Sequence, residues 1–181
     1  MNQKHLAYLL CMVIIPVWSC THMESKKDSK EAENRILQEK DGTVSLILDK
    51  AACYSDVANP SNNTAEWNFF ISKPGHFKVW ITSATKDTTD LNYVNSVRIN
   101  LLDDQLEATP ICDKIVRNSI DILYPYFRAD SYMGSIYVSE PGEYNIQLIS
   151  EKVIAKNAES HNTSLVDDTK LMSVILTPST R

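Results

Sequence analysis

The stretch ISKPGHFKVWITS, residues Ile71–Ser83, indicates the fold class, because a similar stretch, VSEPGEYNIQLIS, follows at residues Val138–Ser150. In both copies a Pro-Gly pair precedes residues that alternate between apolar and polar. Alternation with a period of two is typical of a β-strand that buries one face. A Pro-Gly pair is typical of a type II turn, since proline fixes one backbone angle and glycine tolerates a positive φ. We therefore predict that each copy is a strand, a turn and a second strand, paired antiparallel.

The alternation also predicts which side chains of these strands face a shared interior. In the first copy Phe77, Val79 and Ile81 are predicted to point inward. His76, Lys78 and Trp80 then point to the opposite side. In the second copy the inward set is Tyr144, Ile146 and Leu148, and the outward set is Glu143, Asn145 and Gln147.

Other segments with strand patterns predict an all-β fold. The last segment has apolar residues on both faces, which predicts a central or covered strand. Strands joined by polar loops favour a two-sheet antiparallel β-sandwich of the jelly-roll kind, built from residues 43–181. The further predicted strands lie at residues 43–49, 64–72, 95–102, 118–124, 133–139 and 170–178.

The N-terminus predicts export and a lipid anchor. Residues 1–19 have a basic start and an apolar run too short to cross a bilayer easily, which is typical of a signal peptide. The run ends in VWSC, which resembles the lipobox of bacterial lipoproteins and makes Cys20 the lipidated residue. An ordinary cleaved signal and an uncleaved anchor are the alternatives. We expect a bacterial cell-envelope protein, membrane-attached through lipid alone and facing the periplasm or the exterior, with residues 20–42 as a polar tether.

Composition argues against several kinds of chemistry. A net charge of −5 does not favour nucleic-acid binding. The four glycines are scattered, so no phosphate-binding loop is present, and the histidines and cysteines lack zinc spacing. We predict no cofactor and no metal site, although the pairs Asp103-Asp104 and Asp167-Asp168 leave calcium open beside the simpler reading of solvated turns. Cys53 and Cys112 form either a disulfide or two separate thiols.

A resemblance extends this picture. TAEWNFFISKPGHFKVWI, MGSIYVSEPGEYNIQLI and the closing LMSVILTP resemble the galactose-binding-like β-sandwich domains that accompany bacterial fucosidases and other glycoside hydrolases. The matching residues belong to the scaffold, so the resemblance implies the fold and, only by association, carbohydrate binding. It carries over no ligand residues, because residues 84–132 show no family pattern.

Two groups of residues are candidates for ligand binding. Trp80 lies among polar neighbours, His76 and Lys78, and an aromatic plane beside polar groups suits the C–H face of a sugar ring. The alternative is a Trp covered by the following loop. The second group, from YPYFRADSY, is predicted to lie in one loop, and a structural plug at the sandwich edge is its alternative; the candidates are Tyr124, Tyr126, Phe127 and Arg128.

These observations lead to two hypotheses of function. The first is a non-catalytic envelope lipoprotein whose sandwich retains glycans for separate glycan-processing enzymes. The second is an envelope interaction protein in which the same sandwich binds a protein partner without recognising sugar. The sequence shows no recognisable Ser-His-Asp or Cys-His arrangement, so we expect no enzyme activity.

Overall fold

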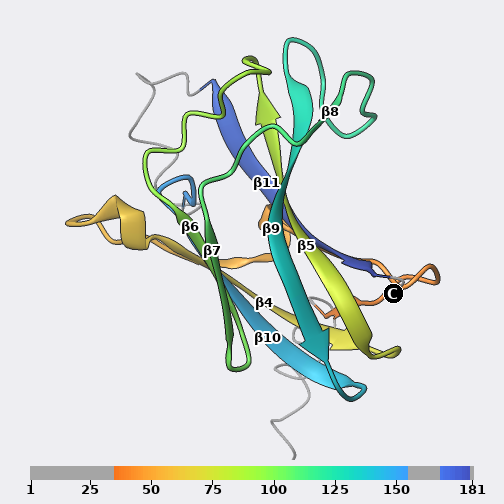
Figure 1. The fold of residues 1–181 in the computed structure, drawn as a ribbon. Coiled ribbons are helices and arrows are strands. Elements are labelled where there is room, and N and C mark those ends of the chain that lie inside the picture. Colours follow the sequence, from red (N-terminus) through yellow and green to blue (C-terminus); the bar gives the residue numbers. More distant parts are fainter. Residues whose placement is uncertain (1–34, 155–167, 180–181) are drawn as a thin grey trace, which may run out of the picture.

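The computed structural model describes residues 35–154 and 168–179, and in this part of the chain the strands form two sheets that face each other (Figure 1). The predicted all-β sandwich is confirmed. The signal peptide, Cys20 and residues 20–34 of the tether lie outside the described residues. Sheet A contains β1 (Ile36–Leu37), β3 (Ala52–Tyr54), β4 (Thr64–Ile71), β6 (Val97–Leu101), β7 (Asp104–Ala108) and β10 (Gly142–Ile149). Sheet B contains β2 (Val44–Ile47), β5 (Gly75–Thr85), β8 (Lys114–Val116), β9 (Phe127–Val138) and β11 (Thr169–Pro178).

The strand order shows that the two repeats pair with each other. In sheet A the order is β1-β4-β10-β6-β7, with β3 also beside β4, and in sheet B it is β2-β11-β5-β9-β8. β4 therefore pairs antiparallel with β10, and β5 with β9. Strand β11 lies between β2 and β5, which confirms the prediction of a central strand. Apart from the parallel pair β1·β4, the ladders of both sheets are antiparallel.

The predicted hairpins at the Pro-Gly pairs are wrong. Each Pro-Gly connection carries the chain from one sheet to the other, from β4 to β5 and from β9 to β10, at the same end of the sandwich (Figure 1). A proline cannot donate a ladder hydrogen bond, so the same dipeptide suits a tight turn and a crossing between sheets. The two glycines also differ, since φ is +150° at Gly75 and is not positive at Gly142.

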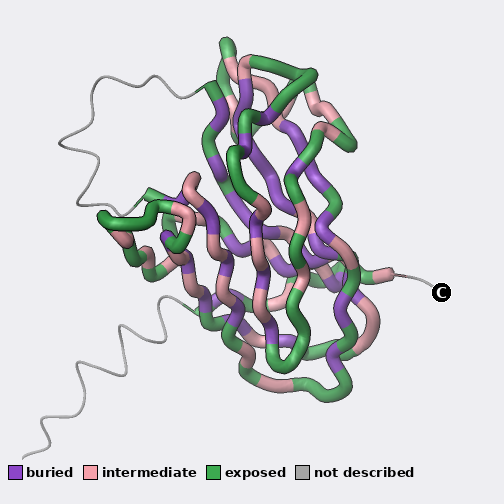
Figure 2. The backbone as a smooth tube through the Cα atoms, turned by 60° about the vertical axis from the view of Figure 1, so that its left-hand side comes forward, coloured by how far each residue is buried: buried purple, intermediate pink, exposed green. Residues whose placement is uncertain are grey.

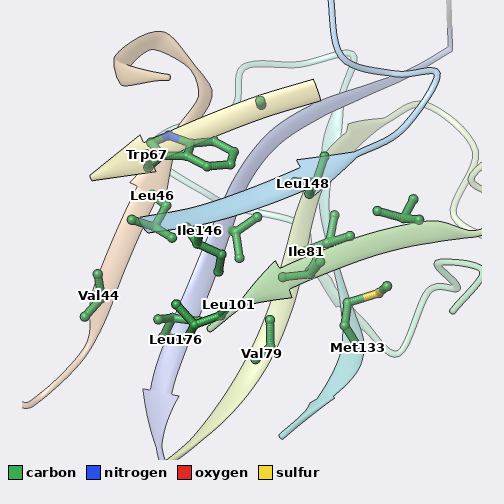
Figure 3. Close-up of a cluster of buried hydrophobic side chains, with 14 of the residues drawn as sticks. Val44, Leu46, Trp67, Val79, Ile81, Leu101, Met133, Ile146, Leu148 and Leu176 are labelled. Carbon is green, nitrogen blue, oxygen red and sulfur yellow. The ribbon is translucent and has the colours of Figure 1, made fainter. Parts of the chain in front are cut away.

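The core lies between the sheets and is built from alternate residues of each strand (Figure 2). Phe77, Val79 and Ile81 are at most 2% exposed, as predicted. Ile146 and Leu148 are fully buried, and Tyr144 packs on the core from a half-buried position. Side chains from both sheets meet in this cluster, among them Leu46, Val79, Ile146 and Leu176 (Figure 3).

Trp67 connects the two sheets through its ring and its indole N–H. Its ring is 2% exposed and rises from β4 of sheet A (Figure 3). Its indole N–H donates to the carbonyl oxygen of Ile47 in β2 of sheet B at 2.8 Å. The largest aromatic side chain of the core therefore also satisfies a main-chain acceptor of the opposite sheet.

Several element boundaries differ from the predictions. Residues 118–124 form no strand, and Ile120 is 94% exposed, because no neighbouring strand covers its apolar side chains. Residues 127–132, predicted as loop, are the first half of β9. In β11 a bulge at Met172 interrupts the strict alternation, so that Leu171 and Val174 both lie on the buried face. The folded part also begins before residue 43, since Ile36 of β1 is buried against β4.

Candidate functional site

The outer face of sheet B combines the two candidate groups that the sequence keeps apart. Because β5 pairs with β9, the outward residues of β5 lie beside those of β9. Trp80 is opposite Tyr132, and His76 is opposite Tyr137. Strand β11 closes the other side, with Ile175 opposite Trp80 and Thr177 opposite Lys78. We define the outer face of sheet B as these outward residues of β5, β9 and β11, together with the flanking Lys86, Lys114 and Tyr126.

A bulge in β9 makes this common face possible. Val79 is paired with Gly134 and Trp80 with Tyr132, so Met133 is the extra residue. Met133 is 5% exposed and points into the core (Figure 3). Without this insertion Tyr137 and Tyr132 would lie on opposite faces, since they are an odd number of positions apart.

Two aromatic rings stand at the centre of the outer face of sheet B. The rings of Trp80 and Tyr132 have centroids 5.2 Å apart and are inclined at 55°. The indole N–H of Trp80 donates to the hydroxyl of Thr177 at 3.2 Å. The hydroxyl of Tyr132, a side chain 43% exposed, is 2.8 Å from that of Ser135. Both rings are thus held by their polar ends, which fixes their orientation while part of each ring meets solvent.

A second aromatic pair lies nearer the Pro-Gly crossings. His76 and Tyr137 have ring centroids 4.6 Å apart, and Tyr137 is 54% exposed. His76 also lines a depression of about 200 Å³ with Gln38, Lys73 and Pro178. This volume is below that of common ligand pockets, about 300–1,000 Å³, so the open face is the better candidate for a large ligand.

On the other side of Trp80 the face becomes charged. Asp130 is 6% exposed and accepts hydrogen bonds from the Arg128 Nε–H at 2.7 Å and the Thr82 hydroxyl at 3.0 Å. The neighbouring Lys86 donates to Asp168 at 3.1 Å. That hydrogen bond raises the pKa of the Lys86 amine above its usual value, so Lys86 stays a cation at neutral pH.

Tyr126 lies between two lysines at this charged end. The Nζ atoms of Lys86 and Lys170 are 5.2 Å and 5.6 Å from the centre of its ring. Both distances are within the range of a cation–π interaction. The predicted loop residue Tyr126 therefore lies beside the outer face of sheet B, two residues before Arg128 in the chain.

Two predicted candidates do not join this face. Phe127 is paired with the buried Thr85, so it belongs to the inner side of β9. Tyr124 is 88% exposed in the loop before β9. Tyr137 and Lys170 were not among the predicted residues, and Tyr132 was considered only as a member of the YPYFRADSY loop; Tyr137 could have been found from its alternation with Ile136 and Val138.

The described residues show no metal centre and no disulfide. No three His, Cys, Asp or Glu residues gather as metal ligands in this part of the chain. Asp103 and Asp104 are exposed, Asp168 is bonded to Lys86, and Asp167 lies outside the described residues. Cys53 and Cys112 are each half-buried and are not bonded to each other. Within the described ranges no helix is long and apolar enough to span a bilayer.

Comparison with known proteins supports the fold. The sequence matches no protein-family model and no curated protein sequence. One similar solved structure is an alpha-L-fucosidase from Vibrio sp. strain EJY3, with a TM-score of 0.63 and 22% identity over 80% of this chain and 24% of the fucosidase chain. Another is a GH26-CBM35 beta-(1,4)-mannanase from Podospora anserina, with a TM-score of 0.44 and 10% identity over 78% of this chain and 29% of that chain. The first likeness supports the two-sheet sandwich, and this chain spans about a quarter of the fucosidase.

Proposed function

We propose that this protein is a non-catalytic, lipid-anchored protein of the bacterial envelope that retains glycans on the outer face of sheet B. Its sandwich would be a galactose-binding-like, carbohydrate-binding module. The observation that carries the proposal is the pair Trp80 and Tyr132, two partly exposed rings fixed by hydrogen bonds to Thr177 and Ser135. A fixed aromatic surface costs little conformational entropy when a sugar ring packs on it, and nearby hydroxyls offer hydrogen bonds to the sugar.

Two further points support this proposal. One similar solved chain is a fucosidase, an enzyme that acts on a sugar, and this protein resembles about a quarter of that chain. The VWSC sequence ending at Cys20 supports the lipid anchor and an extracytoplasmic position. Glycans, or the enzymes that process them, would be the partners at the envelope.

A glycan array probed with the full chain tests the proposal. We expect binding to a defined set of glycans and a loss of about 2 kcal/mol, roughly thirtyfold in affinity, on replacing Trp80 by Ala. Tyr132→Ala should weaken binding to the same glycans. Tyr54→Ala is the matched control, because Tyr54 is an exposed tyrosine of sheet A, 58% accessible. Glycan binding that survives Trp80→Ala and Tyr132→Ala unchanged would exclude this face as the site.

A protein-binding role is the second candidate, and one observation favours it. In the loop between β8 and β9, Ile120, Leu123 and Tyr124 are 94%, 82% and 88% exposed. Adjacent exposed apolar side chains are typical of protein contact sites. If this role is correct, no glycan on the array binds the chain. The chain then captures a specific protein partner, and replacing Ile120 and Leu123 by Ser abolishes that capture.

A further inference from the structure

The outer face of sheet B has a charge opposite to that of the whole chain. The chain carries a net charge of −5. The acidic residues on or beside this face include Asp130, bonded to Arg128, Asp168, bonded to Lys86, and Asp113, which accepts a hydrogen bond from the Tyr132 N–H. The face is therefore a basic patch on an acidic protein, with Lys78, Lys86, Lys114, Arg128 and Lys170 as its cations.

Three of these cations are not neutralised by an ion pair within the described part of the chain. Lys78, Lys114 and Lys170 form no ion pair with any described residue. Lys170 instead lies over the ring of Tyr126. Arg128 uses Nε to bind Asp130, and a guanidinium has further N–H donors on its other nitrogens. The basic charge at this end thus exceeds what the neighbouring carboxylates neutralise.

The register places a small residue between two of the cations. Ala84 of β5 is paired with Lys170 on one side and with Arg128 on the other. Because adjacent strands are about 4.8 Å apart, the backbones of Lys170 and Arg128 are separated by roughly 10 Å across Ala84. Ala84 itself is 4% exposed and therefore covered, and at this end Lys86 and Lys170 flank the ring of Tyr126. This arrangement suits a compact anion held between two long basic side chains.

The basic end of the face lies a short distance along β5 from Trp80. Ala84 follows Trp80 by four residues of β5, which corresponds to about 13 Å at the usual rise of a strand. A short oligosaccharide can reach from one to the other. Its ring faces would pack on Trp80 and Tyr132 while a charged substituent lies beside Tyr126.

We infer that the outer face of sheet B selects an anionic saccharide, with the carboxylate or sulfate group held by Lys170, Arg128 and Lys86 beside Tyr126. This inference rests on the proposed function, because it names the class of glycan that the same face takes. The neutral part of the ligand is recognised by the aromatic pair, and the acidic group distinguishes it from uncharged glycans.

Affinity electrophoresis of the full chain tests the inference with four polymers. Polygalacturonate carries carboxylates, and carboxyl-reduced polygalacturonate has no such charge. Dextran sulfate and dextran form the corresponding pair for sulfate. We expect strong retardation by at least one charged polymer and weak retardation by its neutral counterpart, and the retarding polymer identifies the anionic group.

Two variants distinguish binding by a specific lysine of this face from attraction to the total charge of the chain. Lys170→Gln should weaken binding to the charged polymer about tenfold, since a hydrogen bond to a charged group is lost. Lys152→Gln is the matched control, because Lys152 has the same 5.6 Å distance to a tyrosine ring, that of Tyr93, and is not on the outer face of sheet B. Thermal unfolding confirms that both variants fold.

The remaining outcomes each overturn a specific claim. Equal retardation by charged and neutral polymers would overturn the inference and leave the proposed function in place. Equal losses in Lys170→Gln and Lys152→Gln would also overturn it, because the attraction would then depend on total charge alone. If no polymer here and no glycan on the array binds the chain, the proposed function fails together with the inference.

Discussion

Trp67 shows how one residue can hold both sheets. Its ring fills the core from sheet A, and its N–H satisfies the carbonyl oxygen of Ile47 in sheet B. When a buried acceptor loses its donor, the free energy of unfolding falls by about 1–3 kcal/mol. The same residue type on the outer face, Trp80, is only half-buried and contacts a side-chain hydroxyl instead. The two tryptophans therefore have different roles, one structural and one available for recognition.

Replacing Trp67 by Phe should lower the free energy of unfolding by about 1–3 kcal/mol, because the Ile47 carbonyl oxygen loses its donor and the smaller ring leaves a gap. Urea denaturation measures the change. Trp80→Phe is the control and should cost less than about 1 kcal/mol, since Trp80 lies on the outer face. Equal losses in the two variants would contradict the bridging role of Trp67.

Cys112 gives a prediction about reactivity. Burial, followed by the nearby charges of Asp87, Asp90 and Asp113, raises the pKa of its thiol above the usual value. Since the thiolate is the reactive form, Cys112 should be alkylated by iodoacetamide more slowly at pH 8 in the folded protein than in denaturant. The rate should rise with pH at higher values than for the unfolded chain. Mass spectrometry of the Cys112 peptide follows the reaction, and a folded rate equal to the denatured rate would refute this prediction.

At the scale of elements, the bulge of β9 is a structural requirement of the outer face. Gly134, with φ +136°, lies where a Cβ atom would come within 2.9 Å of Leu106 Cδ2 of β7. A glycine is needed for both reasons, the positive φ and the close approach of the opposite sheet. The bulge also determines which residues of β9 face outward, so it links the core to the recognition face.

Gly134→Ala should destabilise the protein by about 1–3 kcal/mol, through backbone strain and the contact with Leu106. In the double variant Gly134→Ala, Leu106→Ala the contact is gone, and the remaining coupling is measured by a double-mutant cycle. We expect the alanine at 134 to cost less in the Leu106→Ala background than in the wild type. An identical cost in both backgrounds would show that Leu106 does not limit the space at residue 134.

The pairing of the two repeats can be tested by cross-linking. Asn68 of β4 is directly opposite Asn145 of β10, and their side chains are joined at 2.8 Å. Cysteines at opposite positions of an antiparallel pair are within disulfide range. Asn68→Cys with Asn145→Cys should therefore cross-link under mild oxidation in a background where Cys53 and Cys112 are serines. Asn68→Cys with Ile81→Cys should not, because those residues belong to different sheets, whereas a β4–β5 hairpin turning at Pro74-Gly75 would place them opposite each other; a cross-link between them would indicate that hairpin.

The same repeats show what local sequence can and cannot predict. The alternation of Phe77, Val79 and Ile81 gave the correct inner face, because burial on one side depends only on the period of the strand. The pairing partner of that strand is a long-range choice, and the Pro-Gly signal is compatible with both a hairpin and a sheet crossing. The bulge at Met133 inserts one residue, so a strict period of two could not place Tyr132 and Tyr137 on one face.

At the scale of the whole molecule, recognition depends on segments that are far apart in the chain. The outer face of sheet B combines β5, β9 and β11, and its basic end depends on residues that flank those strands. Trp80 and Lys78 could be proposed from sequence, whereas Lys170 could not, because only the β11·β5 register brings it beside Ala84. The residues of the face thus form a site only after the two sheets assemble.

The central claim, that the outer face of sheet B is the glycan-binding surface, is tested most directly by NMR of the tryptophan indole N–H groups during a titration with a glycan that binds. Trp80 donates to Thr177 on this face, while Trp67 is buried and donates to Ile47. We predict that the Trp80 indole signal shifts progressively with saturation and that the Trp67 signal stays in place. Saturable binding that leaves the Trp80 signal unmoved would contradict the claim.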